Sequence, residues 1–173
     1  QRLVQLLRRR ADRDAEHQAD RGPGTDVHQL SHHGALLTDP LVPDDGAQRR
    51  SYVVVDVATA QGPLAIAATH LHSQSTPQIE ALLDAVDGRV PAVIAGDMNF
   101  APEDPEVALF AAEGFVDVVG ATGDPCRTTS AEPTSACDRP DWVFVTPDIR
   151  VDQVDIGETV ASDHLAIHVT LTP

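Results

Sequence analysis

The sequence predicts a mixed α/β domain. Short apolar and β-branched segments outnumber amphipathic helical segments, and turn residues separate them. A length of 173 residues is enough for one domain with a hydrophobic core, and 42% hydrophobic with 23% charged residues is typical of a globular chain. We therefore expect a single domain over residues 1–173, in which helices cover sheets.

Residues 1–48 are predicted to form a helix followed by irregular chain. Leu3, Leu7 and Ala11 recur every four positions, which indicates a helix over residues 1–15 with arginines on its other face. Gly, Pro and Asp are frequent in residues 20–46 and predict turns, apart from a short apolar piece over 33–38. His32 and His33 are accordingly expected to be loop residues.

Residues 49–173 carry clearer patterns. Residues 52–58 and 64–71 are apolar and are joined by Gln61-Gly62-Pro63, which predicts a β-hairpin. Thr76 and Pro77 predict the N-cap and first residue of a helix that Gly88 ends.

The rest of the chain predicts one more helix and five more strands. The helix spans residues 105–113 and is closed by Gly114. The strands are residues 90–95, 115–119, 142–145, 151–156 and 165–171.

The two cysteines, Cys126 and Cys137, lie in a turn-rich segment between the predicted strands. They can form a disulfide that closes one loop, or stay as two thiols in a reducing compartment. We favour the disulfide, because Pro125 and Pro133 indicate that this segment folds tightly.

The charge of the chain narrows the classes of function. The chain has no lysine, so it has neither a P-loop lysine nor a Schiff-base lysine. Its net charge of −15 gives no polybasic track for a nucleic-acid backbone. Abundant arginine without lysine is typical of a GC-rich bacterium. No apolar run approaches the roughly 18 residues of a membrane helix. The sequence starts at Gln1 without a signal-peptide pattern, which is expected for a mature product or for a fragment. Cytoplasm and export both stay open.

Polar residues stand where the predicted strands begin or end. They are His70, Asp97, Asn99, Asp141, Asp163 and His164. Each alone has an ordinary interpretation, as a surface histidine or a turn-capping side chain. Together they supply two histidines and three carboxylates at strand ends, where α/β enzymes hold catalytic groups rigidly. Such a set can exchange protons and bind a hard divalent cation.

Four ordered segments resemble the endonuclease/exonuclease/phosphatase superfamily, the DNase I-like metal-dependent phosphoesterases. They are Ala68-Thr69-His70-Leu71, Ala95-Gly96-Asp97-Met98-Asn99, Arg139-Pro140-Asp141-Trp142-Val143-Phe144-Val145 and Ala161-Ser162-Asp163-His164-Leu165. Arg49-Arg50 before the first strand also fits the family pattern. The resemblance covers residue 49 to the C-terminus and implies a two-sheet α/β sandwich flanked by helices.

The resemblance also implies a role for each of these residues. His164 would be the general base for an attacking water, oriented by Asp141. His70 would bond a phosphate oxygen and stabilise the transition state, and Asn99 would hold a phosphate oxygen. Asp97 would position the nucleophile or a metal. Asp163 would ligate the metal or orient its neighbours.

The implied cofactor is Mg²⁺ or Mn²⁺, because the candidate ligands are carboxylates without cysteine. The family places an Asn on one strand and a metal-binding Glu at the end of the next. Neither motif precedes residue 49, and Glu16 lies within or just after the first predicted helix. We therefore expect the domain to be incomplete at its N-terminus.

The expected partner is a small phosphorylated or phosphodiester substrate, and the expected state is a monomer. The acidic composition disfavours a DNA-tracking endonuclease, which stays an alternative. A second alternative is a catalytically impaired fragment or non-catalytic module of the same fold. A third interpretation takes His70 and His72 as the His-x-His of a binuclear zinc hydrolase, although the Asp and His that would follow are replaced by Gln74 and Ser75. Arg127 and Arg139 are candidate phosphate contacts or members of surface salt bridges.

Overall fold

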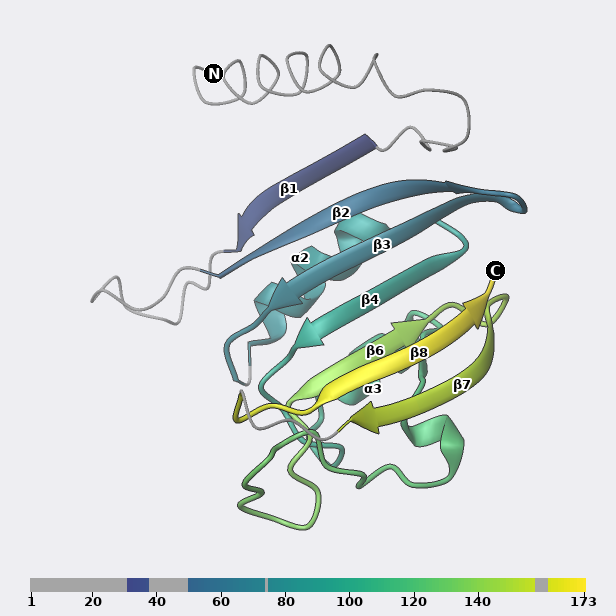
Figure 1. The fold of residues 1–173 in the computed structure, drawn as a ribbon. Helices are drawn as coiled ribbons and strands as arrows, with labels where there is room; N and C mark the ends of the chain where they lie inside the picture. The colour runs from purple at the N-terminus through teal and green to yellow at the C-terminus, as the bar shows by residue number, and fades with distance from the viewer. Residues whose placement is uncertain (1–30, 38–49, 74, 158–161) are drawn as a thin grey trace.

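A computed structural model of the chain describes residues 31–37, 50–73, 75–157 and 162–173 (Figure 1). The predicted helix over residues 1–15 lies outside these ranges. The described elements confirm the α/β fold with two sheets.

The larger sheet has six strands in the order β1-β2-β3-β4-β6-β5. β3 and β4 are parallel, whereas all the other neighbouring strands are antiparallel. The hairpin predicted from the sequence is β2 and β3. The strands are β1 (Ser31–Leu37), β2 (Arg50–Thr59), β3 (Gly62–His70), β4 (Ala92–Asp97), β5 (Val116–Asp117) and β6 (Asp141–Val145).

A second sheet and two helices lie on opposite faces of the larger sheet (Figure 1). The second sheet is the antiparallel pair β7 (Arg150–Gly157) and β8 (Ala166–Thr172). The helices are α2 (Thr76–Val86) and α3 (Val107–Ala112), and a short 3-10 turn, η1 (Gly120–Thr122), follows β5. Neither described helix is long and apolar enough to cross a membrane.

Alternating side chains of the central strands fill two separate cores, because successive residues of a strand point to opposite faces. Ile94 and Phe144 belong to the core beneath the helices. Their chain neighbours Val93 and Val145 belong to the core against β7 and β8. The central strands are therefore covered on both faces, and their polar ends are held by packed apolar residues on either side.

The first strand corrects one prediction. Residues 20–46 were expected to be dominated by turns, with His32 and His33 in a loop, but β1 spans Ser31–Leu37 and includes both histidines. Its pairing with β2, from Ser31↔Asp56 to Leu37↔Arg50, explains the difference. A tertiary partner, which local composition does not report, makes this segment a strand.

The helix starts correct two further details. Ser75, not Thr76, is the N-cap of α2, since its carbonyl accepts bonds from the N–H groups of Gln78 and Ile79. The second helix is shorter than the predicted 105–113, because α3 has helical structure only over Val107–Ala112.

Candidate active site

Three of the candidate residues lie in one row across neighbouring strands. His70 is the last residue of β3 and is paired in register with Asp97, the last residue of β4. Asp97 is in turn the register partner of Asp141, the first residue of β6. Because β3 and β4 are parallel and β6 runs the other way, the three side chains meet at one end of the sheet.

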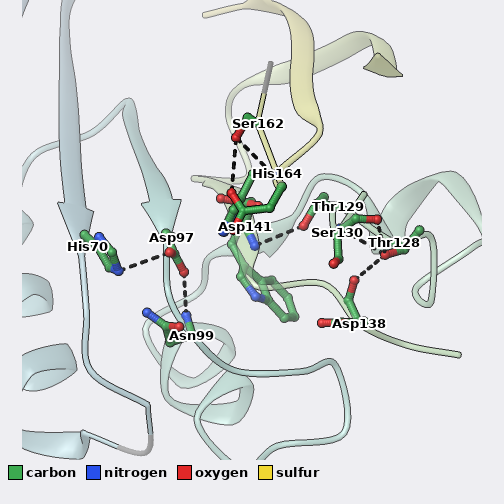
Figure 2. A network of polar contacts seen from close by, with 12 residues as sticks. His70, Asp97, Asn99, Thr128, Thr129, Ser130, Asp138, Asp141, Ser162 and His164 are labelled. Atoms are coloured by element: carbon green, nitrogen blue, oxygen red, sulfur yellow. Dashed lines mark hydrogen bonds and ion pairs between the residues drawn. The ribbon is translucent and has the colours of Figure 1, made fainter. Parts of the chain in front are cut away.

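The row and His164 together form two histidine–aspartate pairs (Figure 2). His70 Nε2 lies 3.1 Å from Asp97 Oδ2, and His164 Nδ1 lies 2.8 Å from Asp141 Oδ2. A carboxylate only accepts, so in each pair the histidine N–H donates. His164 therefore keeps Nε2 for other partners, and both histidines stay partly exposed, with 49% and 38% of their side-chain surfaces accessible for His70 and His164.

Glycine is required immediately before Asp97. A Cβ on Gly96 would lie 1.9 Å from the Thr69 carbonyl oxygen, and the residue has a φ of +149°. Only glycine allows this approach of β4 to β3. Gly96 thus allows the spacing that brings His70 and Asp97 together.

Asn99 lies in a tight turn just after Asp97. Its φ of 52° is left-handed, a conformation in which Asn is enriched. The Asn99 N–H donates to Asp97 Oδ1 over 3.1 Å, and its side-chain Nδ2 donates to the Leu71 carbonyl over 2.9 Å. Asp97 is therefore held from two sides, by His70 and by the turn.

A short stretch of pairing positions His164. Ser130 and His164 form an isolated antiparallel bridge. On either side, the Ala131 N–H donates to the Asp163 carbonyl over 2.9 Å, and the Leu165 N–H donates to the Thr129 carbonyl over 2.7 Å. The Ser162 hydroxyl also accepts the His164 N–H at 3.0 Å.

Thr129 is a site residue that the sequence reading missed. It is fully buried, and its hydroxyl oxygen accepts the Asp141 N–H over 3.2 Å. Because its carbonyl accepts from Leu165, it contacts the chain on both sides of the Asp141–His164 pair (Figure 2). A threonine in a polar loop has no sequence pattern that distinguishes it from an ordinary turn residue.

The hydrogen bond from His164 to Asp141 raises the pKa of the His164 imidazole above its ordinary value. The negative charges of Asp97 and Asp163 add to this shift, and partial burial opposes it. Asp163 is itself exposed, and its charge reaches His164 without a hydrogen bond to it. His164 is therefore a stronger base than a free histidine.

Aromatic side chains pack beneath this end of the sheet. Trp142 follows Asp141, is 1% exposed, and donates through Nε1 to the Phe100 carbonyl over 3.1 Å. Its ring contacts those of Phe100 and Phe144, and Phe144 stacks on Phe110. Large rings bury much apolar surface with few rotatable bonds, so they anchor the chain on either side of the site.

Arg139 is a structural residue and not an open phosphate contact. Its guanidinium donates two hydrogen bonds to the carboxylate of Asp117, over 3.0 Å and 2.7 Å, and lies 3.8 Å above the ring of Trp142. A salt bridge was one of the two sequence interpretations, but it is buried, since the Arg139 side chain has no exposed surface. Among the described ion pairs, none includes Arg127.

The cysteine prediction is confirmed, because Cys126 and Cys137 form a disulfide. The closed loop contains Thr129 and Ser130, which pair with the chain around His164. The Asp138 carbonyl beside the disulfide accepts hydrogen bonds from the Thr128 hydroxyl and the Thr129 N–H. The crosslink is therefore part of the support of the site.

Among the described residues, no three or more His, Cys, Asp and Glu side chains are arranged to hold a metal ion. The available oxygen donors are the neighbouring carboxylates of Asp97 and Asp141 and the exposed Asp163. The family's Asn and metal-binding Glu motifs, which this sequence is expected to lack, would come before residue 49, where the structure describes residues 31–37. His72, the second histidine of the zinc alternative, lies beyond the end of β3, and its N–H donates to Gln78 Oε1 over 3.0 Å.

Solved structures with this fold come from several organisms. An endonuclease/exonuclease/phosphatase from Beutenbergia cavernae superposes with a TM-score of 0.67 at 27% identity, covering 83% of this chain and 45% of that one. A mannosyl-6-phosphatase of Bacteroides thetaiotaomicron gives 0.59 at 19% identity, covering 86% and 68%. The human Nocturnin catalytic domain gives 0.63 at 17% identity, covering 84% and 59%. The chain thus spans about half the length of the Beutenbergia protein.

Curated proteins gave no significant match to the chain. The sequence profile of the Endonuclease/Exonuclease/phosphatase family, in contrast, matches residues 17–164, which include the row and His164. This match extends over most of the 173 residues and agrees with the fold of the solved structures. The chain belongs to the endonuclease/exonuclease/phosphatase family.

Proposed function

We propose that the chain is a metal-dependent hydrolase of phosphate esters or phosphodiesters, in which a histidine-activated water attacks phosphorus in line. One observation carries this proposal. Two histidine–aspartate pairs, from segments far apart in the sequence, meet at one end of the sheet, with Asp97 and Asp141 in register. Paired acid–base groups on a rigid sheet end suit a reaction that moves a proton while charge develops on oxygen.

His164 is the proposed general base. Asp141 accepts from Nδ1, which leaves Nε2 as the basic nitrogen that takes a proton from water. The carboxylate also stabilises the imidazolium that forms, as it does in other histidine–aspartate catalytic pairs. The raised pKa of His164 favours this proton transfer.

His70 and Asn99 are the proposed phosphate-binding groups. Asp97 holds His70 through Nε2, which leaves the Nδ1 side of the ring for a phosphate oxygen. Asn99 gives one amide N–H to Leu71 and has a second for the substrate. Donors fixed in this way stabilise the charge of the transition state without reorganising.

Asp97 and Asp163 are the proposed ligands of Mg²⁺ or Mn²⁺. Their charges, with that of Asp141, all favour the protonated form of His164, so three carboxylates act on this end of the sheet. Oxygen donors of this kind suit a hard divalent cation, which when bound supplies Lewis-acid stabilisation of the phosphoryl oxygens. Asp97 and Asp163 alone do not complete a coordination sphere.

The test of this proposal is hydrolysis of bis-p-nitrophenyl phosphate with Mg²⁺ or Mn²⁺, against a sample with excess chelator. We expect nitrophenolate release that needs the metal, and its loss in His164→Ala. His168→Ala is the matched control, because His168 is an exposed histidine of β8 outside the row. Equal activity of His164→Ala and the unaltered chain would overturn the proposal. No activity in any sample would favour the non-catalytic module.

We further propose that the substrate is small. The net charge of −15 leaves little attraction for a long polyanion, and half of the twelve arginines lie in the first 25 residues. A plasmid-nicking assay with Mg²⁺ checks the endonuclease alternative. Nicking at a rate equal to or above the turnover of the small diester would contradict the preference for small substrates.

A further inference from the structure

A pocket of about 310 Å³ lies beside the catalytic row. Asn99 lines it, whereas His70, Asp97, Asp141 and His164 do not. One wall comes from the segment between β4 and α3, and the other comes from the disulfide loop and the residues that lead into β6. The polar residues of the lining are Asn99, Asp104, Thr134, Ser135, Asp138 and Arg139. Its volume is at the small end of the range for ligand pockets in proteins.

Hydrogen bonds within the chain hold both walls in shape. Asp138 Oδ2 accepts the Thr134 N–H over 2.7 Å and the Thr134 hydroxyl over 3.1 Å. Asp104 Oδ2 accepts the Ala101 N–H over 2.7 Å. The disulfide closes the loop that carries Thr134 and Ser135. The pocket is therefore preorganised, which lowers the entropic cost of binding a ligand.

The charge of the lining is negative. Asp104 and Asp138 are both carboxylates, and Arg139 is neutralised by its two hydrogen bonds to Asp117. No lining residue thus offers an unpaired positive charge to an anion. A second phosphate or a carboxylate in the pocket would be repelled by both aspartates.

The same lining accepts hydrogen bonds readily. An ionised carboxylate has about four lone-pair sites, and the bonds within the chain use only the Oδ2 atoms of Asp104 and Asp138 among the described residues. Ser135 adds a hydroxyl that both donates and accepts. The hydroxyl groups of a ligand can donate to the carboxylates of Asp104 and Asp138, and their oxygens can accept from the Ser135 hydroxyl.

We propose that this pocket binds the alcohol part of the substrate, and that it selects a hydroxyl-bearing alcohol without negative charge. The inference rests on the proposed function, since Asn99 connects the pocket to the site of phosphate hydrolysis. The substrate class is then the phosphate ester of a small polyol or sugar. Esters whose alcohol carries a carboxylate or a second phosphate are disfavoured by the charges of Asp104 and Asp138.

Three phosphate monoesters of similar size and different charge test this selection. Glycerol 3-phosphate has a neutral alcohol, ethanolamine phosphate a cationic one, and 3-phosphoglycerate an anionic one. We expect kcat/KM for released phosphate to be higher for glycerol 3-phosphate than for 3-phosphoglycerate by roughly tenfold or more, because like charges repel at short range. The ethanolamine ester separates a need for hydroxyl groups from simple attraction of positive charge, and a clear preference for it over glycerol 3-phosphate would overturn the polyol assignment.

Variants locate the selection in the pocket. Asp104→Asn with Asp138→Asn removes both charges while keeping the shape, and we expect the ratio between glycerol 3-phosphate and 3-phosphoglycerate to fall toward one. Asp155→Asn, an exposed aspartate of β7, is the matched control and keeps the original ratio. A chain that does not discriminate, or a double variant that keeps the full ratio, would overturn the pocket proposal.

Failure of the proposed function is recognised separately. If neither bis-p-nitrophenyl phosphate nor any monoester is hydrolysed, the same three esters are titrated while the fluorescence of Trp142 is followed. Trp142 is the one tryptophan of the sequence, and its ring lies beneath Arg139 of the pocket lining. Tighter binding of the neutral ester than of the anionic ester would support the pocket proposal without catalysis. Equal binding of the two would overturn it.

Discussion

Asp97 and Asp141 are direct register partners on β4 and β6, and each carboxylate binds a different histidine. Two like charges on neighbouring strands repel each other. Here each has its own donor, His70 for Asp97 and His164 for Asp141. The two pairs are thus built on one pair of opposed residues, and a change at either carboxylate is expected to be felt at both histidines.

The first prediction concerns the pH dependence of His164. Its raised pKa means that the folded chain binds this proton more tightly than the unfolded chain. The resulting stabilisation is fully present below about pH 6.5 and is lost as the pH rises through the folded-state pKa. In Asp141→Asn the main cause of the shift is removed, so an NMR titration in chelator-containing buffer should give a lower His164 pKa.

The matched control for this titration is Asp155→Asn, which changes an exposed aspartate outside the row and leaves the His164 curve unaltered. A His164 curve that is identical in Asp141→Asn and in the unaltered chain would show that the 2.8 Å contact does not control the proton.

The second prediction concerns Thr129. Thr129→Val keeps the shape of the side chain and removes the hydroxyl that accepts from Asp141, whereas Thr129→Ser keeps the hydroxyl. We expect kcat of the valine variant to fall roughly ten- to hundredfold with little change in KM, by analogy with the loss of other supporting hydrogen bonds. Serine should restore most of kcat. Equal kcat values for the two variants, at equal thermal stability, would rule out a positioning role.

The third prediction concerns Gly96. Gly96→Ala places a Cβ against the Thr69 carbonyl in a left-handed backbone, and we expect a loss of about 2–4 kcal/mol in the free energy of unfolding. Gly88→Ala is the control, because Gly88 also has a positive φ of 68° but nothing lies within 4 Å of its Cβ position. Denaturant unfolding compares the two. A smaller loss for Gly96→Ala than for Gly88→Ala would mean that the close approach is not required.

The fourth prediction concerns the disulfide. Cys126→Ser with Cys137→Ser opens a loop whose cysteines are 11 residues apart, and the chain-entropy relation gives a destabilisation of roughly 2–3 kcal/mol. Because the loop includes Thr129, which accepts the Asp141 N–H, we expect the activity of the double serine variant to fall more steeply with temperature than that of the crosslinked chain. Thermal unfolding and phosphodiester hydrolysis, measured with and without a reductant on the unaltered chain, check both effects. If the reductant frees both thiols of the unaltered chain and neither its thermal unfolding nor its activity changes, the disulfide does not support the site.

Most strands of the chain and the polar residues at their ends were accessible from the sequence because each depends on local pattern. The apolar segments before His70 and Asp97, and after Asp141, predict strands that end or begin at those residues. The resemblance to a family then brings the strand ends together. The structure adds the register, which places His70, Asp97 and Asp141 in one row.

Other features depend on partners that no local pattern reports. β1 is a strand because β2 pairs with it, although its composition predicts turns. Thr129 matters because two distant segments donate to it, and Arg139 is buried because Asp117 and Trp142 enclose it. Long-range contacts decide these three cases, and single-residue propensities do not.

Chemical rescue tests the role of His164 most directly. We expect His164→Ala to lose about a hundredfold or more of kcat for bis-p-nitrophenyl phosphate, the usual contribution of a general base. Added imidazole should restore part of this rate, because the His164 side chain is partly exposed and its removal leaves Asp141 to orient the imidazole. The restored rate should rise with the fraction of unprotonated imidazole. A His164→Ala variant that hydrolyses the diester at the unaltered rate, with or without imidazole, would contradict the account.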